Sequence, residues 1–135
     1  MGKLGWIIGT FLAMYVTATI FGFATYLLIS PLAMWVSVFT VMPVLSALLI
    51  YFYLRTIKVS QAASLRESLA IALVWIVLSF ALDAVVYIVV IPLFSHVAPN
   101  WTFFQDQSPW IWLSYVVLLL SALVAHQAYG KRAHA

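Results

Sequence analysis

The chain has 135 residues, of which 67% are hydrophobic and only 7% are charged, and its formal net charge is +3. Soluble domains carry about 25% charged residues. A soluble fold of this size could not hide so much apolar surface, so we expect lipid to be the solvent and residues 1–135 to form one integral membrane domain. The sequence has no cysteine, which excludes disulfides, thiolate metal sites, iron–sulfur clusters and thiol catalysis.

The first two apolar runs predict a pair of transmembrane helices. The first run covers residues 4–29 and is broken by Ser30 and Pro31. Its start imitates a cleavable signal peptide, but the apolar run continues past the small residue Ala24, so we expect it to remain as a helix. The second run covers residues 32–54 and follows after almost no connection.

The third helix is predicted over residues 65–92. It follows a connection that holds Arg55 and Lys58. Ser64 and Glu67 have the spacing of a capping box, in which the serine caps the helix and the glutamate bonds back to the backbone N–H of the capping residue. This pattern indicates a helix that begins directly after Ser64.

The fourth helix is predicted over residues 109–129. Pro109 is favoured at a first helical position, and Gly130 is a common helix stop. The connection before this helix, residues 93–108, is aromatic, and tryptophans cluster near it as in the aromatic belt of bilayer proteins. The tryptophans of this predicted outer boundary are Trp35, Trp101, Trp110 and Trp112.

The basic residues fall on one side of the membrane that these four spans define. They lie before the first span, around the connection between the second and third, and after the fourth: Lys3, Arg55, Lys58, Arg66, Lys131 and Arg132. The positive-inside rule then places both termini in the cytoplasm, in a multi-pass protein of the inner or plasma membrane. Orientation and anionic lipid headgroups explain these charges, so no nucleic-acid partner is expected.

The predicted fold class is an all-α four-helix transmembrane bundle. Residues 26–32 and 87–93 match each other around a Pro-Leu pair, and residues 35–48 and 110–123 match at Trp and at Leu-Ser-Ala-Leu. A true repeat would arrange the bundle as two tandem helical hairpins related by an axis along the membrane normal. Because membrane sequences use a small alphabet, a chance match is the alternative.

Asp83 is the first candidate for a functional group because it lies near the middle of the third span. An acid at mid-bilayer costs about 2.5–3.5 kcal/mol on insertion scales, so we expect it to face other helices. Ser79 and Tyr87 extend a polar stripe at helical spacing. The stripe predicts a site for a proton, a cation or a cationic ligand. The alternative is a neutral acid that bonds to the next helix and holds it in place.

Pro43, inside the second span, is the second candidate. It removes one helical bond and should free the carbonyl of Phe39, next to the hydroxyl of Thr40. These groups and Asp83 could coordinate Na⁺ or H⁺, as in broken-helix transporters. The alternative is a kink that is satisfied locally. Other small or polar residues are expected at this depth, namely Thr19, Gly22, Ser114 and Ser121.

A stripe of small residues runs along the first span. Gly5, Gly9, Ala13 and Thr17 recur every four residues. This pattern lets another helix approach closely. We favour a contact within the bundle, with a dimer face as the alternative.

The histidines do not predict a metal or haem site. His96 and His126 are expected on opposite sides of the membrane, and His134 lies in the tail. No cofactor or metal is therefore expected. A nucleophile, a base and an acid do not converge at one depth, so an enzyme is the least favoured class.

One pattern in the second half of the chain consists of Arg66, Trp75, Leu82-Asp83 and Pro92, followed by an aromatic connection that leads to Pro109-Trp110. With this pattern, about half of the chain resembles a group of small, uncharacterised four-helix integral membrane proteins of prokaryotes. The resemblance implies the four-helix fold and the acid, but no activity.

Three functional classes remain. The first is an oligomeric translocator of a small solute or ion, or a ligand-binding membrane protein, that uses Asp83 as its key group. Four short helices seldom enclose a pathway alone, so this class predicts a homo-oligomer. The second is an accessory or structural subunit that packs against a larger membrane partner through the aromatic connection. The third is a lipid-modifying enzyme, for which a second catalytic group is missing.

Overall fold

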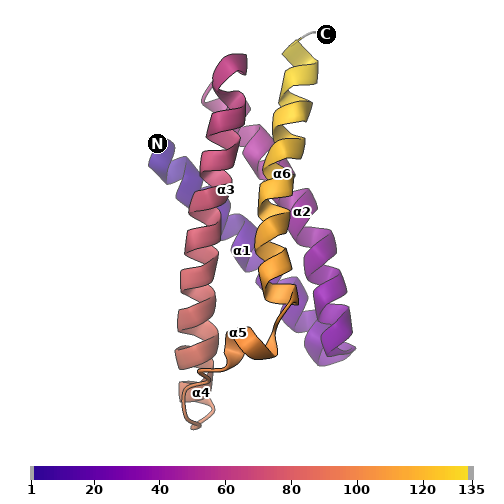
Figure 1. Cartoon of the computed structure of the whole chain (residues 1–135), viewed down its shortest axis with the longest axis vertical. Helices are drawn as coiled ribbons and strands as arrows, with labels where there is room; N and C mark the ends of the chain where they lie inside the picture. The colour runs from indigo at the N-terminus through magenta and orange to yellow at the C-terminus, as the bar shows by residue number, and fades with distance from the viewer. Residues whose placement is uncertain (1, 134–135) are drawn as a thin grey trace.

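The computed structural model describes residues 2–133, and helices account for most of them. Within these residues, four helical segments are long and apolar enough to cross a membrane. They are α1 (Lys3–Leu28), α2 (Pro31–Thr56), a continuous third segment made of α3 (Gln61–Asp83), the π-helix η1 (Ala84–Val90) and α4 (Ile91–Phe94), and α6 (Trp110–Ala133). The short α5 (Phe103–Asp106) lies in the connection before α6 (Figure 1). The prediction of an all-α fold with four long apolar helices is confirmed.

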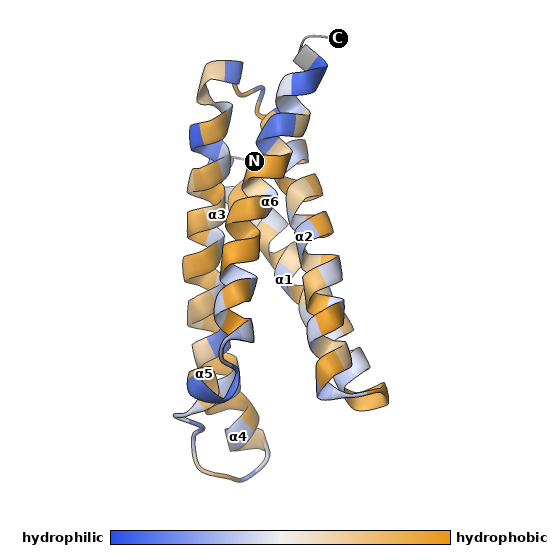
Figure 2. Ribbon diagram, turned by 45° about the vertical axis from the view of Figure 1, so that its right-hand side comes forward, coloured by the Kyte–Doolittle hydropathy of each residue, from blue (hydrophilic) through white to orange (hydrophobic). Residues whose placement is uncertain are grey.

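The long helices form two hairpins, α1 with α2 and α3 with α6. α2 packs along α6 and joins the hairpins, whereas α1 makes few close approaches to α3. α1 runs obliquely, because it starts beside α3 and crosses toward the side of α2 (Figures 1 and 2). We call the end that holds both termini the termini end, and the end that holds α4 and α5 the loop end. The two hairpins diverge toward the loop end.

The matched prolines of the predicted repeat have different structural roles. Pro31 begins α2, where the Ser30 hydroxyl accepts a hydrogen bond from the N–H of Ala33 at 3.1 Å. Proline is favoured there because the first helical N–H has no partner within the helix. Pro92, by contrast, lies inside the continuous third segment. The two hairpins are present, and their origin by duplication stays a prediction.

α3 begins at Gln61, so the capping box predicted at Ser64 is wrong. Ser64 lies inside the helix, where its hydroxyl donates to the carbonyl of Gln61 at 2.8 Å and lies 2.8 Å from Nδ1 of His126 on α6. Glu67 forms an ion pair with Lys3 of α1 at 3.2 Å. A bond within α3 and contacts with α1 and α6, rather than the local capping pattern, therefore occupy the two side chains.

α6 continues past Gly130 to Ala133, so the predicted stop is wrong. A glycine inside a helix is disfavoured by about 1 kcal/mol relative to alanine, and contacts of the preceding residue offset this. The Tyr129 hydroxyl donates to the carbonyl of Val59 at 2.6 Å, and Nε2 of Gln61 donates to the carbonyl of Tyr129 at 3.4 Å. These bonds tie the last turns of α6 to the connection between α2 and α3.

The main core fills the half of the bundle nearer the termini end. At its centre, the fully buried Trp75 donates from its indole N–H to the carbonyl of Ile7 on α1 at 3.2 Å. The core residues come from all four long helices: Phe11, Met14, Ala18, Met42, Ile50, Tyr53, Leu54, Ile71, Ala72, Trp75, Leu118, Ala122 and Ala125. Packed side chains therefore close this half of the molecule.

Hydrophilic residues gather at the termini end and on α5, with apolar residues between them (Figure 2). Lys3 begins α1, and Arg55 and Arg132 lie in the last turns of α2 and α6. The guanidinium groups of Arg55 and Arg132 lie 5.9 and 5.8 Å from the ring centroid of Tyr51. One end of the bundle thus carries the basic residues, while the membrane itself and the side on which the termini lie stay predictions.

The middle residues of the small-residue stripe of α1 do not form the predicted contact with another helix of the bundle. Gly9 and Ala13 are exposed, and no packing neighbour lies within 4 Å of the place that a Cβ of Gly9 would take. The close approach occurs at Gly22, where a Cβ would lie 3.3 Å from Cγ2 of Val38 and 3.6 Å from Cγ of Met34 on α2. The prediction is wrong at Gly9 and Ala13 because that face of the oblique α1 points away from the other helices.

Candidate ligand-binding site

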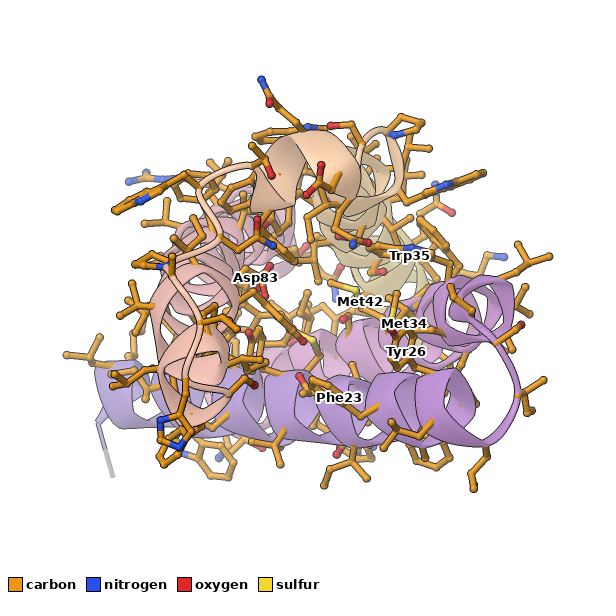
Figure 3. The ribbon with its side chains drawn as sticks, turned by 90° about the horizontal axis from the view of Figure 1, so that it is seen from below. Phe23, Tyr26, Met34, Trp35, Met42 and Asp83 are labelled. Atoms are coloured by element: carbon orange, nitrogen blue, oxygen red, sulfur yellow. The ribbon has the colours of Figure 1, made fainter. Side chains whose placement is uncertain are left out.

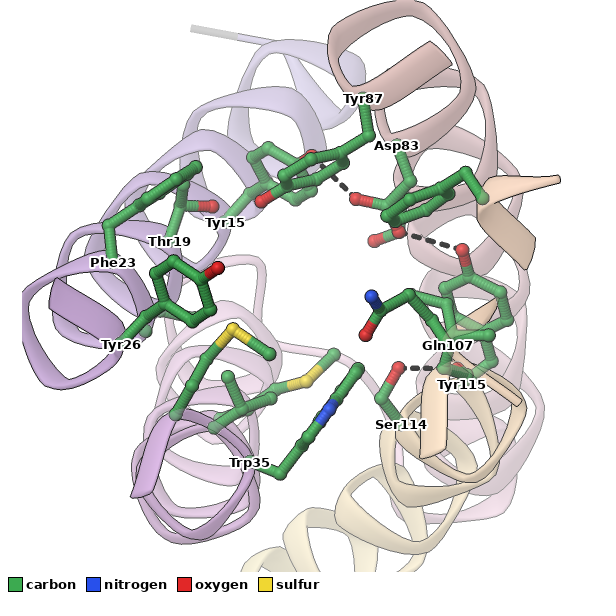
Figure 4. Close-up of a pocket in the computed structure, with 18 of the residues that line it drawn as sticks. Tyr15, Thr19, Phe23, Tyr26, Trp35, Asp83, Tyr87, Gln107, Ser114 and Tyr115 are labelled. Atoms are coloured by element: carbon green, nitrogen blue, oxygen red, sulfur yellow. Dashed lines mark hydrogen bonds between the residues drawn. The ribbon is translucent and has the colours of Figure 1, made fainter. Parts of the chain in front are cut away.

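Asp83, the last residue of α3, is held by tyrosines from two other helices. The hydroxyl of Tyr15 on α1 donates to Oδ1 at 2.7 Å, and the hydroxyl of Tyr115 on α6 donates to Oδ2 at 2.7 Å (Figure 4). Asp83 is only 7% exposed. Hydrogen bonds to a carboxylate are stronger than neutral ones, and two of them fix the orientation of this group. A carboxylate has about four acceptor positions, so about two remain open.

The helix widens directly after Asp83. In η1 the backbone bonds reach five residues back, as shown by the N–H of Ile91, which bonds to the carbonyl of Val86. Tyr87 lies in the middle of this π-helix, one turn after Asp83, and both line one cavity. π-helical turns are frequent at functional sites because they redirect side chains out of the regular helical register.

The connection after the third segment is tied back to η1. Pro92 has no N–H, so it cannot donate to the carbonyl of Ile88 four residues earlier. The N–H of Asn100 donates to that carbonyl instead, at 2.9 Å. This bond satisfies the buried carbonyl and brings the start of α5 over the loop end.

Three aromatic rings from different elements form one wall beside Asp83. Phe103 of α5 stacks on Tyr87 with ring centroids 4.7 Å apart and ring planes 4° apart. Tyr87 also stacks on Phe23 of α1, at 6.0 Å. The aromatic connection thus packs largely on its own chain, although Trp101 remains 77% exposed.

A cavity of about 330 Å³ lies between the two hairpins in the loop-end half. Seen from the loop end, Asp83, Met42 and Phe23 surround an opening between the helices (Figure 3). Its aromatic lining consists of Tyr15, Phe23, Tyr26, Trp35, Tyr87, Phe103 and Tyr115. Its polar lining includes Thr19, Ser79, Asp83, Gln107 and Ser114. The main core lies between this cavity and the termini end.

A buried hydroxyl beside the cavity lacks a hydrogen-bond partner. Ser79, one turn before Asp83, is 2% exposed, and its Oγ bonds to no group among residues 2–133. Ser114, by comparison, donates to the carbonyl of Ile111 at 2.6 Å. Because buried polar groups are normally satisfied, Ser79 is a group that a bound molecule could engage.

No basic side chain of residues 2–133 lines the cavity. Within the described part of the chain, the one ion pair joins Lys3 to Glu67, at the termini end. The carboxyl group of Asp83 therefore has two phenol donors but no cationic partner in residues 2–133.

The residues of the predicted polar stripe lie together. Ser79, Asp83 and Tyr87 all line the cavity. Their helical spacing puts them on one side of the third segment.

The other two predicted site residues do not join Asp83, since Phe39 and Thr40 are not part of the cavity lining. The ring of Phe39 packs against Trp35 and Trp110, with centroids 6.0 and 6.3 Å away. The hydroxyl of Thr40 donates to the carbonyl of Val36 on its own helix at 2.7 Å. The predicted cation site that combines them with Asp83 is not assembled.

The other residues predicted at the depth of Asp83 also fall into two groups, those that line the cavity and those that do not. Thr19, Gly22 and Ser114 line the cavity, whereas Pro43 and Ser121 do not. The hydroxyl of Ser121 donates to a carbonyl of its own helix, at 2.8 Å. Similar depth therefore places residues in one layer, but the rotation of each helix decides which of them face the cavity.

Sequence reasoning did not find the two tyrosines that hold Asp83. A tyrosine inside an otherwise apolar span is a signal that its hydroxyl needs a partner. Which partner it finds depends on how α1 and α6 are rotated against α3. Trp35 was assigned to the outer aromatic belt by its position, yet it also lines the cavity.

The histidines and other metal-ligating residues form no cluster in the described chain. His126 contacts Ser64 near the termini end, and His134 lies outside the described residues. Within residues 2–133, no group of three His, Asp or Glu side chains could hold a metal ion.

Comparisons of the chain with protein-family models, curated proteins and solved structures find no match. The resemblance of the second half to small four-helix membrane proteins therefore stays a prediction. The site combines one buried acid with aromatic walls, and no basic side chain of residues 2–133 lines it.

Proposed function

We propose that this chain is a multi-pass membrane protein that binds a small solute in the loop-end cavity, beside Asp83. The observation that carries the proposal is a buried acid that lines a cavity and has no cationic partner in the described chain. Burying a carboxyl group without a cationic partner is unfavourable, so a functional role is a better reason for it than stability. The unpartnered hydroxyl of Ser79 in the same cavity supports the assignment.

The membrane part of the proposal rests on the outer surface of the helices. Soluble monomers rarely expose contiguous apolar patches larger than a few hundred Å². Here large apolar side chains are exposed along every long helix, among them Leu12, Ile20, Val36, Val44, Val77 and Val116. Basic residues at one end of such a bundle favour cytoplasmic termini in an inner or plasma membrane.

Translocation of the solute is the extension that the packing favours. The cavity opens between the helices at the loop end, while the core around Trp75 separates it from the termini end. Passage across the membrane requires the hairpins to rock so that the cavity opens the other way. In such a movement α1 and α3 would have to part, and side-chain bonds rather than close backbone approach join these two helices. A homo-oligomer would shield the moving surfaces from lipid.

Native mass spectrometry of the protein in a mild detergent tests the proposal. The monomer has a mass of 15.1 kDa, so bound molecules and oligomers are easily resolved. We expect wild type to carry a small-molecule adduct, and Asp83→Asn to lose it while keeping the helical circular dichroism of wild type. Asp106→Asn, the same substitution at an exposed acid of α5, is the matched control and should keep the adduct. An adduct that survives Asp83→Asn removes Asp83 from the site, and a wild type with no adduct overturns the binding function.

An accessory subunit of a larger membrane complex is the second candidate. It is supported by apolar side chains that are exposed at the loop end: Leu93, Phe94, Val97 and Trp101. In that case the native spectrum should contain a larger protein in fixed stoichiometry, and Asp83→Asn should leave that complex intact.

A further inference from the structure

We infer that the solute is a small organic cation with apolar groups around its positive charge, such as a tertiary or quaternary amine. This inference rests on the proposed function and adds the chemical class of the ligand. Two independent features of the cavity carry it, namely its charge and the composition of its walls.

The charge of the cavity favours a cation. Among the described residues, Asp83 is the one acid of the lining, and no Lys, Arg or His faces it there. An ionised Asp83 would repel an anion, and a neutral solute would leave it without a counter-charge, whereas a cation can pair with it. In a site of low dielectric constant, one close opposite charge is worth far more than in water. The acceptor positions that Tyr15 and Tyr115 leave open can receive an ammonium group.

The walls of the cavity favour an organic cation. The stacked rings of Phe23, Tyr87 and Phe103 form one side, and Trp35 faces the cavity from α2 (Figure 4). Aromatic faces attract cations through their quadrupole, tryptophan most strongly, and surround quaternary ammonium groups in known recognition sites. The same surfaces bury the apolar substituents of the ligand.

The lining does not suit a bare metal ion. Ca²⁺ takes six to eight oxygen ligands, and Mg²⁺ demands a near-ideal octahedron of them. The acidic oxygen ligand that the described lining offers is the carboxyl group of Asp83. The hydroxyls of Tyr15 and Tyr115 already donate hydrogen bonds to this group. Much of the remaining surface is carbon and the thioethers of Met14, Met34 and Met42. A cavity of about 330 Å³ is also within the size range of small-molecule sites, roughly 300–1,000 Å³.

A pair of probes that differ only in charge tests the inference. Phenyltrimethylammonium and its carbon isostere tert-butylbenzene have the same shape, with a quaternary nitrogen or a quaternary carbon at the centre. Both are titrated at matched free concentrations into the purified full-length protein in detergent, with isothermal calorimetry as the readout. We expect wild type to bind the cation at least about tenfold more tightly.

Two pairs of variants separate the contribution of the Asp83 charge to binding from that of the aromatic walls. Asp83→Asn should bind both probes with similar affinity, whereas Asp106→Asn should keep the wild-type preference. Trp35→Leu should weaken binding of the cation about five- to thirtyfold. Trp101→Leu, which changes a tryptophan that is 77% exposed, should bind like wild type.

The possible results separate this inference from the proposed function. Equal or tighter binding of tert-butylbenzene to wild type overturns the cation assignment. If Ala18→Phe, which fills the cavity from α1, then abolishes binding of both probes, the cavity still binds solutes and the proposed function stands. A neutral or anionic adduct in the native spectrum also overturns the cation assignment alone. If neither probe binds and wild type carries no adduct, both conclusions fall.

Discussion

The termini-end and loop-end halves of this bundle use the same four helices, but one half is a closed core and the other holds a cavity. Around Trp75, α3 and α6 present small side chains, including Ala72, Ala122 and Ala125, which are at most 1% exposed. Around Asp83, by contrast, helices meet through long side chains, because Tyr15 and Tyr115 reach the carboxyl group with their hydroxyl tips.

The kind of contact between helices sets the space between them. In lipid, helices associate through close packing and through hydrogen bonds between side chains. Small residues let two backbones approach, whereas a tyrosine hydroxyl bonds at the far end of its side chain and keeps the backbones apart. α1 reaches Asp83 through Tyr15, and the volume left between the hairpins becomes the cavity.

The largest expected effect tests the closed half. Trp75→Ala removes a fully buried indole and its hydrogen bond to the carbonyl of Ile7. Replacing a buried tryptophan with alanine lowers the free energy of unfolding by about 3–5 kcal/mol. Unfolding monitored by circular dichroism in mixed micelles measures the change. Trp101→Ala at the exposed loop is the control and should be near neutral. Equal stability of these two variants would show that Trp75 does not hold the core together.

An intermediate effect tests where α1 and α2 approach most closely. Gly22→Val adds a side chain whose Cβ lies 3.3 Å from Cγ2 of Val38, and overpacking of this kind costs about 1–3 kcal/mol. Gly9→Val makes the same change where a Cβ meets no packing neighbour, so its free energy of unfolding should stay close to that of wild type. The same unfolding assay compares the two. A larger loss at Gly9 would indicate that the exposed stripe of α1 is the real contact surface, for example in a dimer.

The smallest expected effect tests the cavity half. Ser79→Ala removes a hydroxyl without a partner among residues 2–133, so the free energy of unfolding should change by less than about 0.5 kcal/mol. Tyr115→Phe removes a bond to Asp83 and should cost roughly 0.6–1.7 kcal/mol. Chemical unfolding of the ligand-free protein measures both. If Ser79→Ala lowers the free energy of unfolding as much as Tyr115→Phe does, Ser79 stabilises the fold and is not a free ligand-binding group.

The long helices could be predicted because their signal is local. A continuous apolar run of about 20 residues implies a spanning helix wherever the rest of the chain lies. Their ends were harder to predict, because contacts with distant residues decide them. Ser64 bonds to His126 rather than capping α3, and the bonds of Tyr129 carry α6 past Gly130.

In the candidate site, too, the residues related by local spacing could be predicted, and those that depend on distant contacts could not. Ser79, Asp83 and Tyr87 share one helical segment, so their spacing alone puts them on one face. Phe39 and Thr40 were placed with them by depth, but depth does not determine rotation. The packing of α2 turns these two residues away from the cavity.

Local patterns in the sequence account for the chemistry of this protein, namely apolar helices, basic residues near their ends and one acid among apolar neighbours. The tertiary structure alone decided what surrounds that acid. Helical periodicity relates residues within one helix, but the tilt and rotation of one helix against another depend on many side chains packing at once. Tyr15 and Tyr115 lie at opposite ends of the chain, and they meet at Asp83 because α1 crosses the bundle obliquely and α6 returns beside α3.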